Sequence, residues 1–191
     1  MRVIAGQYRG RTLAAPQGTN TRPTADRTRE ALFHILTTTL PRAWDDLRVL
    51  DLFCGSGALA IEALSRGAIH ATLVDGGADA IATTKANLKS LGLQDRARVV
   101  HGELPRALTT LPRNTGYNLV FADPPYALDP APTLNALLEL SADNAVLCVE
   151  HGASARPIPP RGWRLLQRRT WGQTTISFFR REPRSSDASG S

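Results

Sequence analysis

Apolar and polar positions alternate along the middle of this chain in two patterns that predict different elements. Short apolar runs, which predict buried strands, occur at residues 49–54, 71–75, 97–100, 117–122 and 145–150. Stretches with a helical spacing of apolar residues lie between them, at residues 58–66, 79–91, 104–111 and 133–140. Strands that alternate with helices in this way are typical of an α/β protein with a doubly wound, mostly parallel sheet.

The two ends of the chain follow other patterns. Residues 2–5 and 11–14 flank a turn with glycines at both ends, which predicts a small β-hairpin extension over residues 1–20. The apolar positions Leu32, Ile35, Leu36 and Leu40 predict a helix that Thr24 or Asp26 can cap and that Pro41 ends. Residues 163–169 and 174–180 predict two antiparallel strands that close a seven-stranded sheet.

Length and composition indicate one main domain. A chain of 191 residues with 42% apolar and 21% charged residues is typical of a globular protein. We expect the main domain at residues 21–181 and a disordered tail at residues 182–191, which lack apolar content. No window approaches the ~18 uncharged apolar residues of a membrane span, and no secretory signal is evident. The expected location is therefore the cytoplasm.

The net charge of +6 is distributed unevenly. Residues 1–48 carry +4, residues 49–150 carry −4 and residues 151–191 carry +6. Basic ends can form a surface that contacts the phosphates of a nucleic acid. Because 21 of the 23 basic residues are arginine, a GC-rich genome is the competing explanation. The cysteines, Cys54 and Cys148, and the four scattered histidines show no metal-ligand spacing, so no metal is expected.

A glycine-rich turn follows the first apolar run, in the sequence Asp51-Leu-Phe-Cys-Gly55-Ser-Gly57. Such a turn brings backbone N–H groups close to a ligand at the carboxyl edge of a sheet. Asp75, 24 residues after Asp51, is placed to accept hydrogen bonds from ribose hydroxyls. A carboxylate at Asp51 disfavours a phosphate and suits a cationic ligand, so S-adenosylmethionine fits better than a dinucleotide.

A second motif, Asp123-Pro124-Pro125-Tyr126, follows the apolar run at residues 117–122. The prolines stiffen the loop, so that Asp123 and the Pro124 carbonyl can both accept hydrogen bonds from one NH2 group. Tyr126 offers a ring on which a planar base can stack. Together the two motifs resemble those of class I S-adenosylmethionine-dependent methyltransferases that act on exocyclic amines.

The chain resembles the RsmD family of bacterial 16S ribosomal RNA guanine-N2 methyltransferases, which have the Rossmann-like fold of class I methyltransferases. The resemblance rests on residues 3–11 (VIAGQYRGR), residues 22–30 (RPTADRTRE), the glycine turn with residues 62–67 (EALSRG), and the DPPY motif. It spans residues 2–181, and the block at residues 22–30 is its most specific part.

This resemblance implies a role for each matching residue. The turn at Gly55, Ser56 and Gly57, with Asp51 and Phe53 beside it, would hold the methionine part of the cofactor. Asp75 would hold the ribose and Glu103 the adenine amino group. The catalytic set would be Asp123, Pro124, Pro125 and Tyr126, with the target guanine stacked on Tyr126. The chain departs from the family at Gly76 and Gly77, where a larger residue is common, and at Glu103, where Asp or Asn is common.

The expected partner is 16S ribosomal RNA or the assembling small subunit, bound by a monomer. The candidate RNA-binding residues are Tyr8, Arg9, Arg11, Arg22, Arg27 and Arg29. Two alternatives stay open: an adenine-N6 DNA methyltransferase, which can use the same DPPY loop, and a non-catalytic nucleotide- or RNA-binding module on the same fold.

Overall fold

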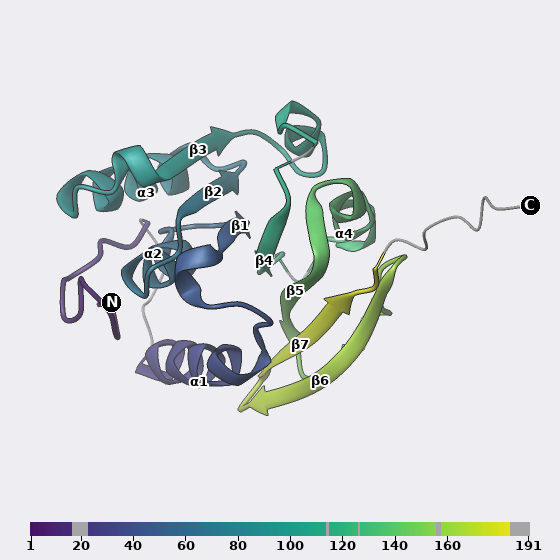
Figure 1. The fold of residues 1–191 in the computed structure, drawn as a ribbon. Helices are drawn as coiled ribbons and strands as arrows, with labels where there is room; N and C mark the ends of the chain where they lie inside the picture. Colours follow the sequence, from purple (N-terminus) through teal and green to yellow (C-terminus); the bar gives the residue numbers. More distant parts are fainter. Residues whose placement is uncertain (17–22, 114, 126, 156–157, 184–191) are drawn as a thin grey trace, which may run out of the picture.

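Seven strands form one sheet at the centre of the protein (Figure 1). The computed structural model describes residues 1–16, 23–113, 115–125, 127–155 and 158–183. The strands are β1 (Arg48–Leu52), β2 (His70–Asp75), β3 (Ala97–His101), β4 (Tyr117–Ala122), β5 (Ser141–Gly152), β6 (Trp163–Trp171) and β7 (Thr174–Arg181). Their order across the sheet is β3-β2-β1-β4-β5-β7-β6. All seven coincide with predicted strands: β1 to β5 contain the apolar runs, and β6 and β7 contain the two alternating segments near the C-terminus.

The sheet is parallel from β3 to β5, and β7 is antiparallel to both of its neighbours. This arrangement confirms the predicted α/β fold with a mostly parallel sheet and an antiparallel strand near the C-terminus. β1, β4 and most of β5 are buried on both faces, as expected for parallel strands covered by helices. Their carboxyl ends meet at one edge of the sheet, where open α/β folds bind ligands.

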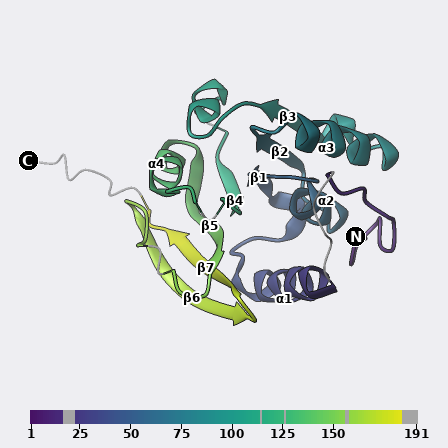
Figure 2. The ribbon, with the colours of Figure 1, turned by 180° about the vertical axis from the view of Figure 1, so that it is seen from behind.

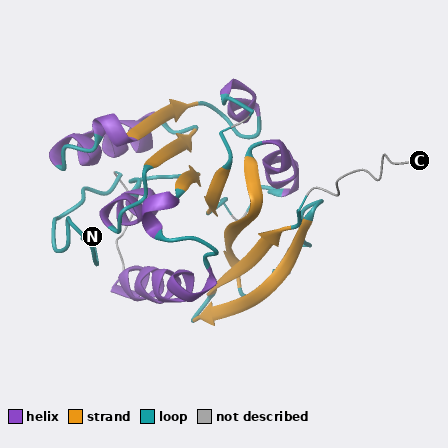
Figure 3. Ribbon diagram, viewed as in Figure 1, coloured by secondary structure: helices purple, strands orange, loops and turns teal. Residues whose placement is uncertain are grey.

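Helices cover both faces of the sheet (Figures 2 and 3). One face packs against α1 (Pro23–Thr39), α2 (Ala58–Ser65) and α3 (Ala78–Ser90). The other face packs against α4 (Ala131–Asn135) and two 3-10 helices, Arg106–Thr110 and Ala136–Glu139. Two further 3-10 helices span Trp44–Asp46 and Gln94–Arg96. The helices predicted at residues 104–111 and 133–140 are therefore largely 3-10 turns, since a short stretch gains little from α-helical hydrogen bonds.

Helix α1 begins at Pro23, earlier than expected. The predicted caps Thr24 and Asp26 lie inside the helix, so the capping prediction was wrong. Proline suits a first helical position, because it has no N–H to leave without a partner. The carboxylate of Asp26 pairs with the guanidinium of Arg29 one turn later, at 3.0 Å.

The predicted hairpin at the N-terminus contains one bridge in place of two strands. Arg2 pairs with Thr12 in an antiparallel bridge, and the Val3 N–H donates to the Arg11 carbonyl at 3.0 Å. The turn between them lies against α2, where a side chain at Gly6 would overlap the Ser65 carbonyl. The Gln7 N–H donates to that carbonyl at 2.8 Å. Because the turn gives its N–H groups to α2, they are not available to extend a ladder.

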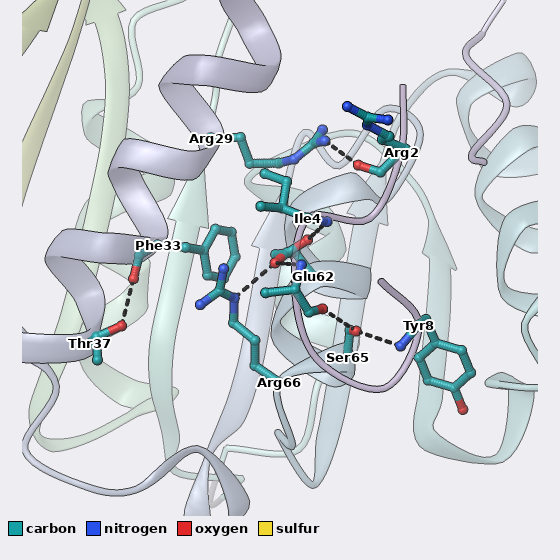
Figure 4. Close-up of polar contacts among 10 residues, drawn as sticks. Arg2, Ile4, Tyr8, Arg29, Phe33, Thr37, Glu62, Ser65 and Arg66 are labelled. Atoms are coloured by element: carbon teal, nitrogen blue, oxygen red, sulfur yellow. Dashed lines mark hydrogen bonds and ion pairs between the residues drawn. The ribbon is translucent and has the colours of Figure 1, made fainter. Parts of the chain in front are cut away.

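Glu62 of α2 fastens this N-terminal segment to the domain (Figure 4). Its carboxylate is 1% exposed and accepts hydrogen bonds from the Ile4 N–H at 2.7 Å and the Ala5 N–H at 3.0 Å. It also accepts one from Nε of Arg66 at 2.8 Å. A second anchor is Ser65, whose hydroxyl donates to the Ala5 carbonyl and accepts from the Tyr8 N–H. Residues 1–13 are therefore part of the packed domain.

The tail predicted at residues 182–191 lies mostly outside the described residues, of which Glu182 and Pro183 are the last. Among the residues that the structure describes, no helix has both the length and the apolar character required to cross a bilayer.

We expect Glu62→Ala to lower the free energy of unfolding by about 3 kcal/mol, because it leaves two backbone N–H groups and the Arg66 guanidinium without their acceptor. Chemical denaturation measures the change. Glu139→Ala, at an exposed position, is the matched control and should change stability by less than about 0.5 kcal/mol. A decrease for Glu62→Ala no larger than that of the control would show that the carboxylate does not anchor the N-terminal segment.

Candidate active site

The glycine turn between β1 and α2 contains residues with positive φ angles, and a hydrogen bond to Asp51 holds the helix that follows it. Phe53, Gly55 and Gly57 have φ angles of 58°, 54° and 76°, in the left-handed region. The buried carboxylate of Asp51 accepts a hydrogen bond from the Ala60 N–H at 3.0 Å, in the first turn of α2. Burial raises the pKa of Asp51, and the nearby carboxylates of Asp123 and Asp75 add to the shift, while the Ala60 N–H opposes it.

Asp75, at the end of β2, links two turns. Its carboxylate accepts hydrogen bonds from the Gly55 N–H at 2.9 Å and from the Gly77 N–H at 2.8 Å. Each of its oxygens bonds one of these donors and retains a free lone pair for a hydroxyl group. A side chain added at Gly55 would point into open space, so the turn leaves room for a ligand beside Asp75.

Gly76 and Glu103, where the sequence is expected to depart from the family pattern, lie next to one another. A Cβ atom at Gly76 would lie 2.5 Å from Oε1 of Glu103, so the Glu103 carboxylate occupies the space that a larger residue 76 would fill. The Glu103 side chain lies on the loop after β3, next to β2. Because residue 76 has no side chain, the longer side chain of Glu103 can take the space beside it.

The proline corner follows β4 at the same edge of the sheet. Pro124 is buried, and the Leu128 N–H donates to the Pro125 carbonyl at 2.9 Å, which closes a turn. The Asp123 side chain keeps access to solvent, yet it is surrounded by enough protein that desolvation raises its pKa to about 6. Tyr126, expected to stack on the base, lies outside the described residues.

Glu150 is a site residue that our sequence analysis did not single out. In the register of the sheet Ala122 lies opposite Val149, so Asp123 and Glu150 follow at neighbouring positions on β4 and β5. Desolvation and the charge of Asp123 raise the pKa of Glu150 to about 7. The available signal was an acid directly after a buried apolar run, the same pattern that identified Asp123.

The candidate RNA-binding residues do not all lie on the surface. Arg9, Arg11 and Arg27 are exposed, and Tyr8 is half-buried against α2. Arg22 lies outside the described residues. Arg29 is 7% exposed, and its guanidinium donates to the Arg2 carbonyl at 2.6 Å and to Asp26. Arg29 therefore holds α1 against the N-terminal segment and does not present its charge to a partner.

The N-terminal segment also reaches the glycine turn. The Ser56 hydroxyl lies 3.4 Å from the Met1 sulfur, and a guanidinium nitrogen of Arg29 lies 3.7 Å from the same atom. The first residue of the N-terminal segment thus lies against the glycine turn. Within the described residues, no three His, Cys, Asp or Glu side chains are grouped to hold a metal ion.

Comparison with known proteins agrees with these features. The model of the family described as conserved hypothetical protein 95 matches residues 1–180. Ribosomal RNA small subunit methyltransferase D of Escherichia coli K12 is 37% identical over 95% of this chain and 90% of its own length. YlbH of Bacillus subtilis is also 37% identical, over 95% of this chain and 99% of its own length.

Solved structures show the same fold. The structure of yhhF from Escherichia coli has a TM-score of 0.79 and 37% identity, and covers 95% of this chain and 98% of its own. The rRNA methyltransferase aviRa from Streptomyces viridochromogenes has a TM-score of 0.67 over 88% of each chain, and at 18% identity it is evidence for the fold alone.

Glu150 makes the stability of this protein dependent on pH. Because its folded-state pKa of about 7 lies above the ordinary value of 4.5, ionisation destabilises the folded state as the pH rises through this range. We expect Glu150→Gln to be more stable than the wild type by about 1–3 kcal/mol at pH 8 and by less at pH 5. Thermal unfolding at both pH values measures the gap. The control Glu139→Gln, at an exposed position, should change stability by less than about 0.5 kcal/mol. A stability difference between Glu150→Gln and the wild type that is equal at both pH values would contradict the assignment.

Proposed function

Because this chain belongs to the RsmD family, whose model carries the description conserved hypothetical protein 95, we propose that it methylates the exocyclic N2 amine of a guanine in 16S ribosomal RNA. The methyl donor is S-adenosylmethionine. The observation that carries the proposal is the convergence of the glycine turn, Asp75 and the Asp123-Pro124 corner at one edge of the sheet, on β1, β2 and β4. A cofactor bound beside the glycine turn and Asp75 would lie next to a base held by the Asp123-Pro124 corner.

The residues at this edge fit S-adenosylmethionine. Open space beside Gly55 suits the methionine part, with Asp51, Phe53, Ser56 and Gly57 around it. The free lone pairs of Asp75 suit the ribose hydroxyls, and Glu103 suits the adenine amine. The absence of basic side chains from this set agrees with a ligand that carries no phosphate. Bound here, the cofactor would supply an electrophilic methyl group on a positively charged sulfur.

Asp123 and the Pro124 carbonyl would act on the guanine amine. The N2 lone pair is delocalised into the ring, so nitrogen attacks poorly until it becomes pyramidal. Acceptors for its two N–H groups favour that change and bind more strongly as positive charge develops on nitrogen. Asp123 is also placed to accept the proton that N2 loses, and its pKa of about 6 makes it a better base than an ordinary aspartate. Pro125 and Tyr126 complete the corner, with the tyrosine ring stacked on the base.

RNA would be bound by the N-terminal extension (residues 1–20) and by the first residues of the main domain, which spans residues 21–181. Tyr8, Arg9, Arg11, Arg22 and Arg27 would contact phosphates or bases, whereas Arg29 would act by packing. We further infer that the enzyme works as a monomer in the cytoplasm, where its ribosomal substrate is found.

Methyl transfer from radiolabelled S-adenosylmethionine to small subunits that lack the modification tests this function. Nucleoside analysis should show N2-methylguanosine. N6-methyladenosine would favour the adenine-N6 methyltransferase, and binding of S-adenosylhomocysteine without any transfer would favour the non-catalytic module.

Asp123→Ala should lower the single-turnover rate of methyl transfer by about 10- to 150-fold, because it removes a charge-assisted hydrogen bond of roughly 1.5–3 kcal/mol from the transition state. Affinity for S-adenosylhomocysteine should stay within a few-fold, and calorimetric titration measures it. Asp129→Ala, on the exposed loop that follows, serves as the matched control. Near-normal turnover by Asp123→Ala would refute the catalytic role.

The double variant Arg9→Ala and Arg11→Ala should weaken RNA binding. It should also reduce the dependence of log K on log salt concentration by about one for each phosphate that the protein no longer neutralises. Filter binding over a range of salt concentrations measures the slope. Arg113→Ala, after the 3-10 helix Arg106–Thr110 on the other face of the sheet, is the control. A slope equal to that of the wild type would show that Arg9 and Arg11 of the N-terminal extension do not neutralise RNA phosphates.

A further inference from the structure

Glu150 and Asp123 are neighbouring carboxylates without donors among the described residues. The register of β4 and β5 ends with Ala122 opposite Val149, so Asp123 and Glu150 are the next residues of the two segments, and the charge of Asp123 acts on Glu150. On its other side, Glu150 lies opposite Ile176 of β7, which is apolar. Neither carboxylate takes part in a hydrogen bond or ion pair with another described residue. Asp123 is exposed and Glu150 is half-buried, and a carboxylate that is partly removed from water gains from a ligand that brings a donor.

The other two acids at this edge, Asp51 and Asp75, already accept hydrogen bonds from backbone N–H groups of the protein. Asp51 accepts from the Ala60 N–H, and Asp75 accepts from the Gly55 and Gly77 N–H groups. Both therefore hold the glycine turn in place. The charge of Asp123 raises the pKa of two acids, Asp51 and Glu150. Of these two, Glu150 accepts no hydrogen bond from another described residue.

We propose that Glu150 accepts a hydrogen bond from N1–H of the target guanine and selects guanine at this site. The inference rests on the proposed function and names the base that the site prefers. The Watson–Crick edge of guanine presents three N–H groups side by side, one on N1 and two on N2. Asp123 and the Pro124 carbonyl supply two acceptors for N2, and Glu150 supplies the third acceptor on the adjacent strand.

The same arrangement disfavours adenine. Adenine also presents an exocyclic NH2 group, but its N1 is an acceptor with no hydrogen. Above about pH 7 Glu150 is ionised and has no hydrogen to donate, so it would face the lone pair of adenine N1 without forming a hydrogen bond. Sites with buried polar groups strongly reject ligands that leave those groups unpaired, and the comparison of the two bases is therefore made at pH 8. Glu150 thus gives a physical reason for a DPPY corner to act on guanine and not on adenine.

The experiment replaces the methylated guanine with 2-aminopurine, which keeps the N2 amine and has no hydrogen on N1. Small subunits are reconstituted with 16S RNA that carries either base at the position that the wild-type enzyme methylates. Wild-type enzyme should methylate 2-aminopurine about 10- to 150-fold more slowly in a single turnover, the factor expected for a charge-assisted hydrogen bond. The amide of Glu150→Gln can donate to N1, so this variant should show a preference for guanine at least about tenfold smaller.

Two controls separate selection from a structural effect. Glu150→Asp keeps an acceptor and should still methylate guanine faster than 2-aminopurine. Glu139→Gln should show the same ratio of the two rates as the wild type. Equal wild-type rates on the two bases would overturn the proposal without any variant, even if Glu150→Gln does not fold. An undiminished preference in folded Glu150→Gln would also overturn it. Failure of the proposed function is seen separately, because natural subunits would then yield no N2-methylguanosine and both proposals would fall.

Discussion

The grouping of four carboxylates at the carboxyl edge of the sheet, partly removed from water, is the constraint around which the site is arranged. Asp51, Asp75, Asp123 and Glu150 come from β1, β2, the end of β4 and β5, and the parallel pairing of these strands brings them to the same edge. Asp51 and Asp75 are stabilised by backbone N–H groups of the glycine turn and the start of α2. Asp123 and Glu150 have no such donors among the described residues; desolvation raises the pKa of both, and the charge of Asp123 adds to the shift at Glu150. A site with unsatisfied acceptors is prepared for a ligand that brings donors and positive charge, as the sulfonium cofactor and the guanine edge would.

The N-terminal segment connects this site to the exposed arginines that we propose bind RNA. Glu62 and Ser65 fasten it to α2, and Arg29 joins it to α1. The segment keeps Arg9 and Arg11 exposed while Met1 contacts Ser56 in the glycine turn. Residues that hold RNA phosphates and residues that hold the cofactor would thus be positioned by one rigid unit, which favours accurate placement of the base.

Several features were predictable because they depend on neighbours in the sequence. The apolar runs predicted the first five strands of the sheet and the alternating segments predicted the last two. The glycines at residues 55 and 57 predicted a turn, in agreement with their left-handed φ angles. Helices were less predictable where they were short, since the stretches at residues 104–111 and 133–140 fold largely into 3-10 turns. The start of α1 at Pro23 shows that an available capping residue does not by itself decide where a helix begins.

By itself, the sequence determined the strand and helix order, the glycine turn and the proline corner, because local periodicity and backbone preferences act over a few residues. Only the tertiary structure decided that Glu150 lies beside Asp123, that Glu103 fills the space above Gly76 and that Arg29 is buried. Each of these facts depends on strand order or on packing between segments far apart in the chain. An acid or an arginine looks the same in a sequence whether its neighbour is water, a like charge or a backbone carbonyl, and folding determines which of these it contacts.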